Sequence, residues 1–226
     1  GQSAVLGMDS AVAAQIAVDE INARGGINGK KIQLIIEDDQ YNIAKAATAY
    51  KKLVEVDGVK LILANTYGSI FALADEAEKD GVILLDPLDC NKVLAELNDN
   101  VFCLATDSES IATALVGNAE QNNVKKVAII HWNSDSFMPL VKDFFVEKFK
   151  TGEAKVVEGY SAGTTDFRTI LLKAIDKKVD AIVFLGYDET GLAMKQAREL
   201  GFSGKFYANG TITSPSLQKI AEGSAE

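Results

Sequence analysis

The feature that most constrains this chain is the alternation of short apolar runs with segments of helical spacing. Three segments repeat apolar residues at the helical period: 13–21, 46–54 and 192–200. Near-continuous apolar runs of strand length are typical of parallel strands that are buried on both faces. Such runs lie at Ile32–Ile36, Leu61–Leu63, Val82–Leu85, Val127–Ile130 and Ala181–Leu185. The alternation predicts an α/β protein in which parallel sheets are flanked by helices.

Helix ends are marked by residues that favour caps. Arg24-Gly25-Gly26 and Leu200-Gly201 predict helix C-termini, because glycine accepts the left-handed conformation found there. Asp107 predicts an N-cap, with further polar and acidic residues in the first turn. The helices are therefore expected to end at these points.

Length and charge limit the classes of function. The 226 residues could form one large domain or two α/β lobes of about 100 residues each. With 23 basic and 32 acidic residues the net charge is −9, which repels nucleic acids and anionic membranes. His131 is the single histidine, and no serine or cysteine nucleophile stands in a strained elbow. We therefore expect no enzyme activity, catalytic residue, metal site or cofactor.

The two cysteines leave two interpretations open. Cys90 and Cys103 could form a disulfide, which would suit an oxidising compartment. Alternatively they are separate thiols, with Cys103 buried in a strand.

Ligands of open α/β sheets bind beyond the carboxyl ends of the strands, so the residues after each run are candidates for a site. Asn65-Thr66-Tyr67-Gly68-Ser69 follows one run and opens a helix, where free N–H groups suit a carboxylate. Asp86 to Asp89 follows the next run. Tyr187 and Glu189 follow a third, and the acid there could pair with an ammonium group. Glu189 could instead only complement a helix dipole.

Several motifs in one order resemble the periplasmic branched-chain amino-acid binding proteins of the Leu/Ile/Val type, the solute receptors of ABC importers. Residues 17–30 are similar to the family pattern A-x-D-x-I-N-x-x-G-G-I-x-G, and Asp38-Asp39 follows as in the family. Further similarities lie at 165–167, 179–182 and 195–201. The resemblance covers essentially the whole chain.

The resemblance implies a two-lobe, periplasmic-binding-protein-like (type I) fold, each lobe a parallel sheet flanked by helices. The first lobe is expected at 1–106, the second at 107–210, and 211–226 is expected to return to the first lobe. The family's chains begin with a strand before Gly1 and continue beyond Glu226, so we expect this sequence to be truncated at both ends.

The resemblance also implies a ligand site in the cleft between the lobes. The family's carboxylate-binding loop falls on Tyr67, Gly68 and Ser69, beside Asn65. Its second loop falls on 86–90, including Asp86, Leu88 and Asp89, where the two acids depart from the family's small residues. Its second-lobe aromatic residue falls on Ser136 or Phe137. Its acid for the ligand ammonium falls on Glu189, beside Tyr187.

These expectations define a function. The resemblance implies capture of an amino acid, amide or related amine by closure of two lobes, delivery to the membrane subunits of an ABC importer, and a periplasmic or extracellular location, with a lipid anchor on the full-length protein. The alternatives are a ligand-sensing domain of a receptor or regulator, and a flavodoxin-like enzyme.

Overall fold

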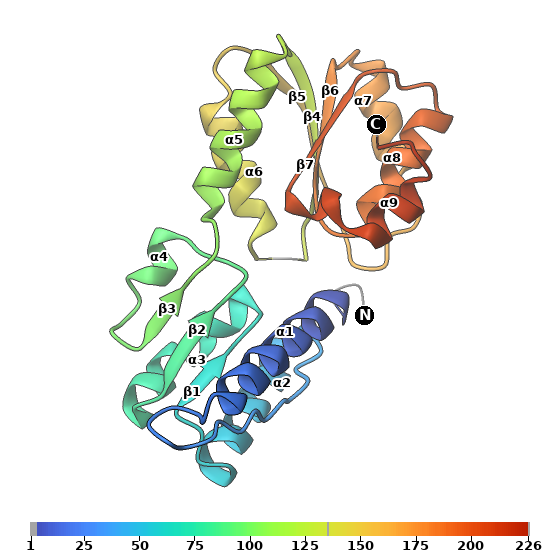
Figure 1. The fold of residues 1–226 in the computed structure, drawn as a ribbon. Helices are drawn as coiled ribbons and strands as arrows, with labels where there is room; N and C mark the ends of the chain where they lie inside the picture. Colours follow the sequence, from blue (N-terminus) through green and yellow to red (C-terminus); the bar gives the residue numbers. More distant parts are fainter. Residues whose placement is uncertain (1–3, 135, 226) are drawn as a thin grey trace. The chain divides into compact units, whose positions relative to one another are not determined.

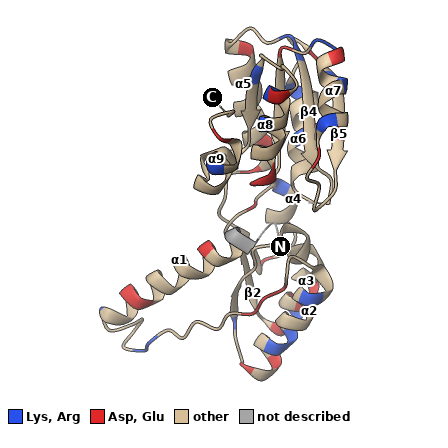
Figure 2. Ribbon diagram, turned by 90° about the vertical axis from the view of Figure 1, so that its right-hand side faces the viewer, with Lys and Arg blue, Asp and Glu red and all other residues tan. Residues whose placement is uncertain are grey.

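The computed structural model describes residues 4–134 and 136–225, and the side chains of this range from residue 7 onward. The chain divides into two compact units, of which the first ends at Ala105 and the second begins at Thr106. None of the helices described combines the length and apolar character needed to cross a bilayer. Acidic and basic residues occur in both units (Figure 2).

The first unit is built on a small parallel sheet in the order β1-β2-β3 (Figure 1). Its strands are β1 (Leu61–Leu63), β2 (Ile83–Asp86) and β3 (Val101–Cys103). Its helical segments are α1 (Ala4–Ala23), α2 (Ile43–Lys51), the π-helical continuation η1 (Lys52–Val56), α3 (Tyr67–Asp80) and α4 (Lys92–Ala95).

One face of this first sheet is covered and the other is open among the residues described. Ile62, Leu84 and Val101 are buried on the covered side, together with Ile70 and Leu73 of α3. The register aligns Leu61 with Ile83, Leu63 with Leu85, and Leu85 with Phe102. Of this second set, Leu61, Leu63, Ile83 and Phe102 are exposed. Burial on both faces, which the apolar runs predicted, therefore does not hold for the part of this unit that the structure describes.

The predicted strand at Ile32–Ile36 is wrong: these residues belong to no strand or sheet in the structure. Ile32 is held instead by the Asn22 side chain, whose Oδ1 accepts from the Ile32 N–H at 2.7 Å and whose Nδ2 donates to the Ile32 carbonyl at 2.8 Å. Ile16, on the predicted apolar stripe of α1, is 55% exposed.

The turn after α1 confirms the predicted glycine cap. Gly25 and Gly26 have φ values of +101° and +78°, which side-chain-bearing residues rarely adopt. A Cβ on Gly26 would also collide with the Lys30 carbonyl, since Ile27 and Lys30 form a bridge there. Asp107 confirms the predicted N-cap, accepting from the Ser110 N–H at 2.9 Å.

The second unit contains a parallel sheet in the order β5-β4-β6-β7. Helices α5 and α6 lie on one side of it and α7 and α8 on the other (Figure 1). Its strands are β4 (Lys126–Trp132), β5 (Glu153–Tyr160), β6 (Ala181–Leu185) and β7 (Lys205–Ala208). Its helices are α5 (Ser108–Gln121), α6 (Met138–Lys148), α7 (Arg168–Asp176), α8 (Glu189–Glu199), the 3-10 helix η2 (Gly210–Thr213) and α9 (Pro215–Ala221).

Burial in this unit centres on β6, whose five residues are all fully buried. A central strand covered on both faces has no polar side, which explains its uninterrupted apolar sequence. Residues 211–226 were expected to return to the first unit. The described part of this segment packs in the second unit, where α9 lies against α8 and buries Leu217 and Ala221.

Candidate functional site

In the first unit the loop after β1 leads directly into α3, as the pattern predicted. Asn65 is half-buried, Tyr67 is buried at the first position of α3, and Gly68 is half-buried. The Tyr67 hydroxyl accepts a hydrogen bond from Asn91 Nδ2. Ser69 is 1% exposed, and its Oγ has no hydrogen-bond partner among the residues described. This turn therefore holds a buried hydroxyl that a ligand could satisfy.

Asp86, at the end of β2, binds backbone N–H groups of the loop that follows it. Its Oδ1 accepts from the N–H groups of Leu88 and Asp89, both at 2.9 Å, while Oδ2 has no partner among the described residues. Burial raises the pKa of Asp86 to about 6, although the two N–H bonds act in the opposite direction. The buried Asp86 carboxylate therefore stabilises the conformation of this loop.

The two loops of the first unit come close to each other. Burial raises the pKa of Tyr67, and the charges of Asp89 and Asp86 add to this effect. Asn91 links the loops directly, because its Nδ2 reaches Tyr67 while its Oδ1 caps α4 at Leu94 N with a distance of 2.7 Å.

A disulfide joins Cys90 to Cys103 and resolves the two interpretations of the cysteines. It fastens the loop after β2 to the end of β3, across a sequence separation of 13. Closing a loop of this length stabilises a fold by about 3 kcal/mol in the chain-entropy account. Asp89 and Asn91 flank Cys90, so the bond also restrains the loop that approaches Tyr67.

In the second unit the predicted residues after β4 separate. Ser136 is exposed, whereas Phe137 is 2% exposed and lies at the start of α6. The aromatic residue at the strand end is instead Trp132, whose ring meets that of Tyr187 edge-on at 5.2 Å between centroids.

Tyr187 and Glu189 lie together where β6 leads into α8. Glu189 Oε1 accepts from the Tyr160 hydroxyl at 2.5 Å and from the Tyr187 N–H at 3.1 Å. Glu189 Oε2 is buried and has no partner among the residues described. The carboxylate thus offers one buried acceptor oxygen, which suits a cationic hydrogen-bond donor.

The neighbouring Asp188 differs from Glu189 in that both of its carboxylate oxygens accept hydrogen bonds. Its Oδ1 accepts from the Ser214 hydroxyl at 3.0 Å, and its Oδ2 accepts from the Ser216 hydroxyl. Asn209 Oδ1 accepts from the Gly186 N–H at 3.2 Å, and the Thr211 hydroxyl donates to the Gly186 carbonyl at 2.9 Å. Residues 209–216 therefore hold the loop that carries Glu189.

The full length of the chain, residues 1–226, matches the family described as periplasmic binding protein. The chain belongs to the periplasmic binding protein family. The Leu/Ile/Val-binding protein of Escherichia coli K12 is 28% identical over 100% of this chain and 63% of that protein. The chain therefore spans less than two thirds of the length of this relative.

Solved structures of periplasmic binding proteins agree with this assignment. The branched-chain amino acid transporter substrate binding protein of Streptococcus pneumoniae, in complex with isoleucine, is 32% identical with a TM-score of 0.83, over 92% of this chain and 60% of that one. A leucine binding protein of Thermotoga maritima is 25% identical with a TM-score of 0.85, over 94% and 61%. The two-lobe type I fold is thereby confirmed.

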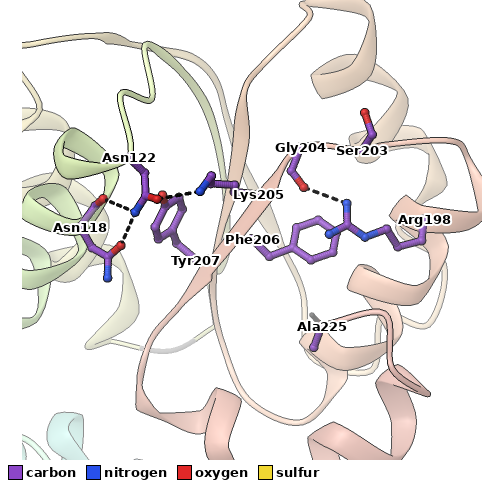
Figure 3. Close-up of a pocket in the computed structure, with 9 residues that line it drawn as sticks. All are labelled: Asn118, Asn122, Arg198, Ser203, Gly204, Lys205, Phe206, Tyr207 and Ala225. Atoms are coloured by element: carbon purple, nitrogen blue, oxygen red, sulfur yellow. Dashed lines mark hydrogen bonds between the residues drawn. The ribbon is translucent and has the colours of Figure 1, made fainter.

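This periplasmic binding protein also has a cavity away from the strand ends. It measures about 400 Å³ and lies beside the start of β7 (Figure 3). Arg198 there donates to the carbonyls of Phe202 and Gly204, both at 2.8 Å, and lies 4.0 Å from the Phe206 ring centre. Lys205 Nζ donates to Asn122 Oδ1 at 2.6 Å. Both cations thus serve the fold, and the strand ends remain the better candidate site.

Two residues near the candidate site, Tyr160 and Asn209, were not predicted from the sequence. Tyr160 was missed because β5 mixes polar and apolar residues and was not predicted as a strand. Asn209 was missed because β7 is a short edge strand. The run at 153–160 does contain Val156, Val157 and a terminal tyrosine, a β-favouring signal that could have revealed the strand. His131, the single histidine, lies within β4, and burial lowers its pKa.

Proposed function

We propose that this protein captures a small amino-acid-like ligand between its two lobes and presents it to the membrane subunits of an ABC importer. The family and the relatives named above support this proposal, since they are solute-binding proteins and not enzymes. Ligand contacts to both lobes would stabilise the closed form over the open one.

The observation that carries the proposal is Glu189 Oε2, which is buried and accepts no hydrogen bond from any residue that the structure describes. A buried carboxylate oxygen without a donor is costly, and a ligand ammonium would remove that cost. In the first lobe, the proposed contacts for the other end of the ligand are Asn65, Tyr67, Gly68 and Ser69, with Leu88 and Asp89 from the second loop.

The acids of the second loop favour a ligand end that is less anionic than a free carboxylate. Asp86 and Asp89 are both buried, and the negative charges of both raise the pKa of Tyr67. A carboxylate placed there would meet like charges. An amide or a basic group would not, so we include amides and amines in the proposed ligand class.

The protein is proposed to work outside the cytoplasm, as the family description and the disulfide support. We further propose that a lipid anchors the full-length protein to the membrane. An anchored protein would sediment with membranes and be released by detergent.

Calorimetric titration of a panel of amino acids, their amides and polyamines tests the proposal. We expect at least one amine to bind, and Glu189→Gln to weaken it by roughly tenfold or more, the usual size for a charged hydrogen bond. Glu199→Gln, at the exposed end of the same helix, is the matched control and should leave affinity unchanged. Equal affinities in wild type and Glu189→Gln would remove Glu189 from the site.

A further inference from the structure

Two hydrogen bonds from described residues converge on one oxygen of the Glu189 carboxylate. The Tyr160 hydroxyl at 2.5 Å and the Tyr187 N–H at 3.1 Å both donate to Oε1. These two bonds orient the carboxylate, so that Oε1 is bound by the protein and Oε2 remains available as an acceptor. The remaining Oε2 is buried with no partner among the residues described.

Tyr160 reaches this oxygen from two strands away. It is the last residue of β5, while Glu189 follows β6, and β4 lies between these strands in the sheet. Two strand spacings are roughly 10 Å, so a long side chain is needed to cross the sheet edge. The Tyr160 ring is buried and meets Phe167 edge-on at 5.1 Å between centroids, which fixes its direction.

Gly186 provides the space for this hydroxyl. A Cβ at position 186 would collide with the Tyr160 hydroxyl oxygen. It would also lie 2.9 Å from Glu189 Oε1 and 2.9 Å from Thr190 Cγ2. Glycine is therefore required here by the close approach of side chains.

We propose that Tyr160 is a positioning residue for ligand recognition: through its hydroxyl, seated over Gly186, it holds Glu189 so that Oε2 is presented to a primary ammonium group. This inference rests on the proposed function. It assigns amine selectivity to a contact between β5 and the start of α8. Neither Tyr160 nor Gly186 needs to touch the ligand.

The test compares ligands that differ only in the amine. Titrations use leucine with 4-methylpentanoate, and leucinamide with 4-methylpentanamide. Tyr160→Phe keeps the ring against Phe167 but removes the donor. We expect it to weaken the amine-bearing member of a pair by about tenfold and the deaminated member by less than about twofold. Equal losses for both members, or no loss for either, would overturn the inference.

Failure of this inference can be told apart from failure of the proposed function. A wild-type protein that binds none of the four compounds would overturn the inference as stated. The wider panel described above then decides on solute capture, because binding of any other compound there preserves the proposed function.

A double-mutant cycle tests the steric part without any ligand. Gly186→Ala should lower the melting temperature in the wild-type background, where the new methyl group meets the hydroxyl oxygen. In the Tyr160→Phe background the same substitution should lower the melting temperature clearly less, because the tyrosine hydroxyl oxygen that meets the methyl group is absent. Strictly additive shifts in melting temperature would show that Gly186 does not serve Tyr160.

Discussion

Asp86 combines complete burial with an ionisable group that is only half satisfied. Oδ1 organises the loop by accepting two backbone N–H bonds, and this is the role that asparagine and aspartate play in many turns. Oδ2 has no such partner among the described residues, so ionisation is penalised and the pKa rises to about 6. The loop needs an acceptor at this position but does not need a charge.

Asp86→Asn should therefore stabilise the protein at neutral pH. The folded-state pKa lies above the ordinary value of 3.8, so the contribution of Asp86 to folding is complete below pH 3.8 and is lost as the pH rises through 6. The two-unit shift corresponds to roughly 2–3 kcal/mol. Urea unfolding at pH 4 and pH 7 should show variant and wild type similar at pH 4 and the variant more stable at pH 7.

Asp99→Asn, at an exposed position, is the control for this comparison and should not change the pH dependence. If the wild type and Asp86→Asn keep the same difference in unfolding free energy at both pH values, the burial argument for Asp86 is wrong.

Individual site residues could be predicted where they directly follow an apolar strand. The structure places Tyr67, Ser69 and Glu189 at the starts of α3 and α8, as their positions after apolar runs predicted, and their role in a ligand site stays a prediction. The burial of Asp86 could not be predicted, since an acid at a strand end reads as solvated. The contact of Tyr160 with Glu189 joins residues 29 apart in the sequence, and no local pattern encodes it.

Among the elements, the crossing of α8 and α9 depends on one small residue. Gly191 faces α9 so closely that a Cβ would lie 2.7 Å from the Leu217 carbonyl oxygen and 3.3 Å from the Ala221 N. Both of these are backbone atoms, which cannot move aside as a flexible side chain can. The α8–α9 packing in turn supports Asp188 through Ser214 and Ser216.

Gly191→Ala should destabilise the second unit by about 1–3 kcal/mol, the usual cost of overpacking. Gly117→Ala is the matched change in α5, where a Cβ would meet nothing within 4 Å. It should stabilise the protein by about 0.5–1 kcal/mol, because alanine loses less conformational freedom in a helix. Chemical denaturation of both variants measures the two effects, and equal signs would contradict the packing argument.

Four of the five predicted strands appear as elements, although only β6 is buried along its whole length and β1 buries Ile62 alone. The exception, 32–36, shows that an apolar sequence is not sufficient for a sheet strand. A strand also needs a neighbour with free N–H and C=O groups, and no described strand pairs with this segment. Pairing is a long-range property that hydrophobic periodicity does not carry.

The two units of the molecule differ in the kind of sheet on which they are built. Strands of the first unit have three or four residues and leave one set of side chains exposed. The longest strands of the second unit have seven and eight residues, and its β6 is fully buried. Local opening follows burial and backbone pairing, so the units should open with different free energies.

Hydrogen exchange followed by mass spectrometry should resolve this difference. We expect peptides containing β4 and β6 to exchange more than about tenfold more slowly than peptides containing β1 and β2. Uniform protection across both sets would mean that the molecule opens as one cooperative unit, which the contrast in burial does not predict.

The complete burial of β6 has a consequence before folding is finished. Five consecutive apolar residues with strong β-propensity can stack between identical chains at about 4.8 Å, as in amyloid. Asp180 stands directly before β6, and Asp188 follows it closely. In a stack of identical segments these carboxylates would lie above one another and repel. Charges at both ends of such a run would oppose aggregation of the newly made chain until β4 and β7 cover the two edges of β6.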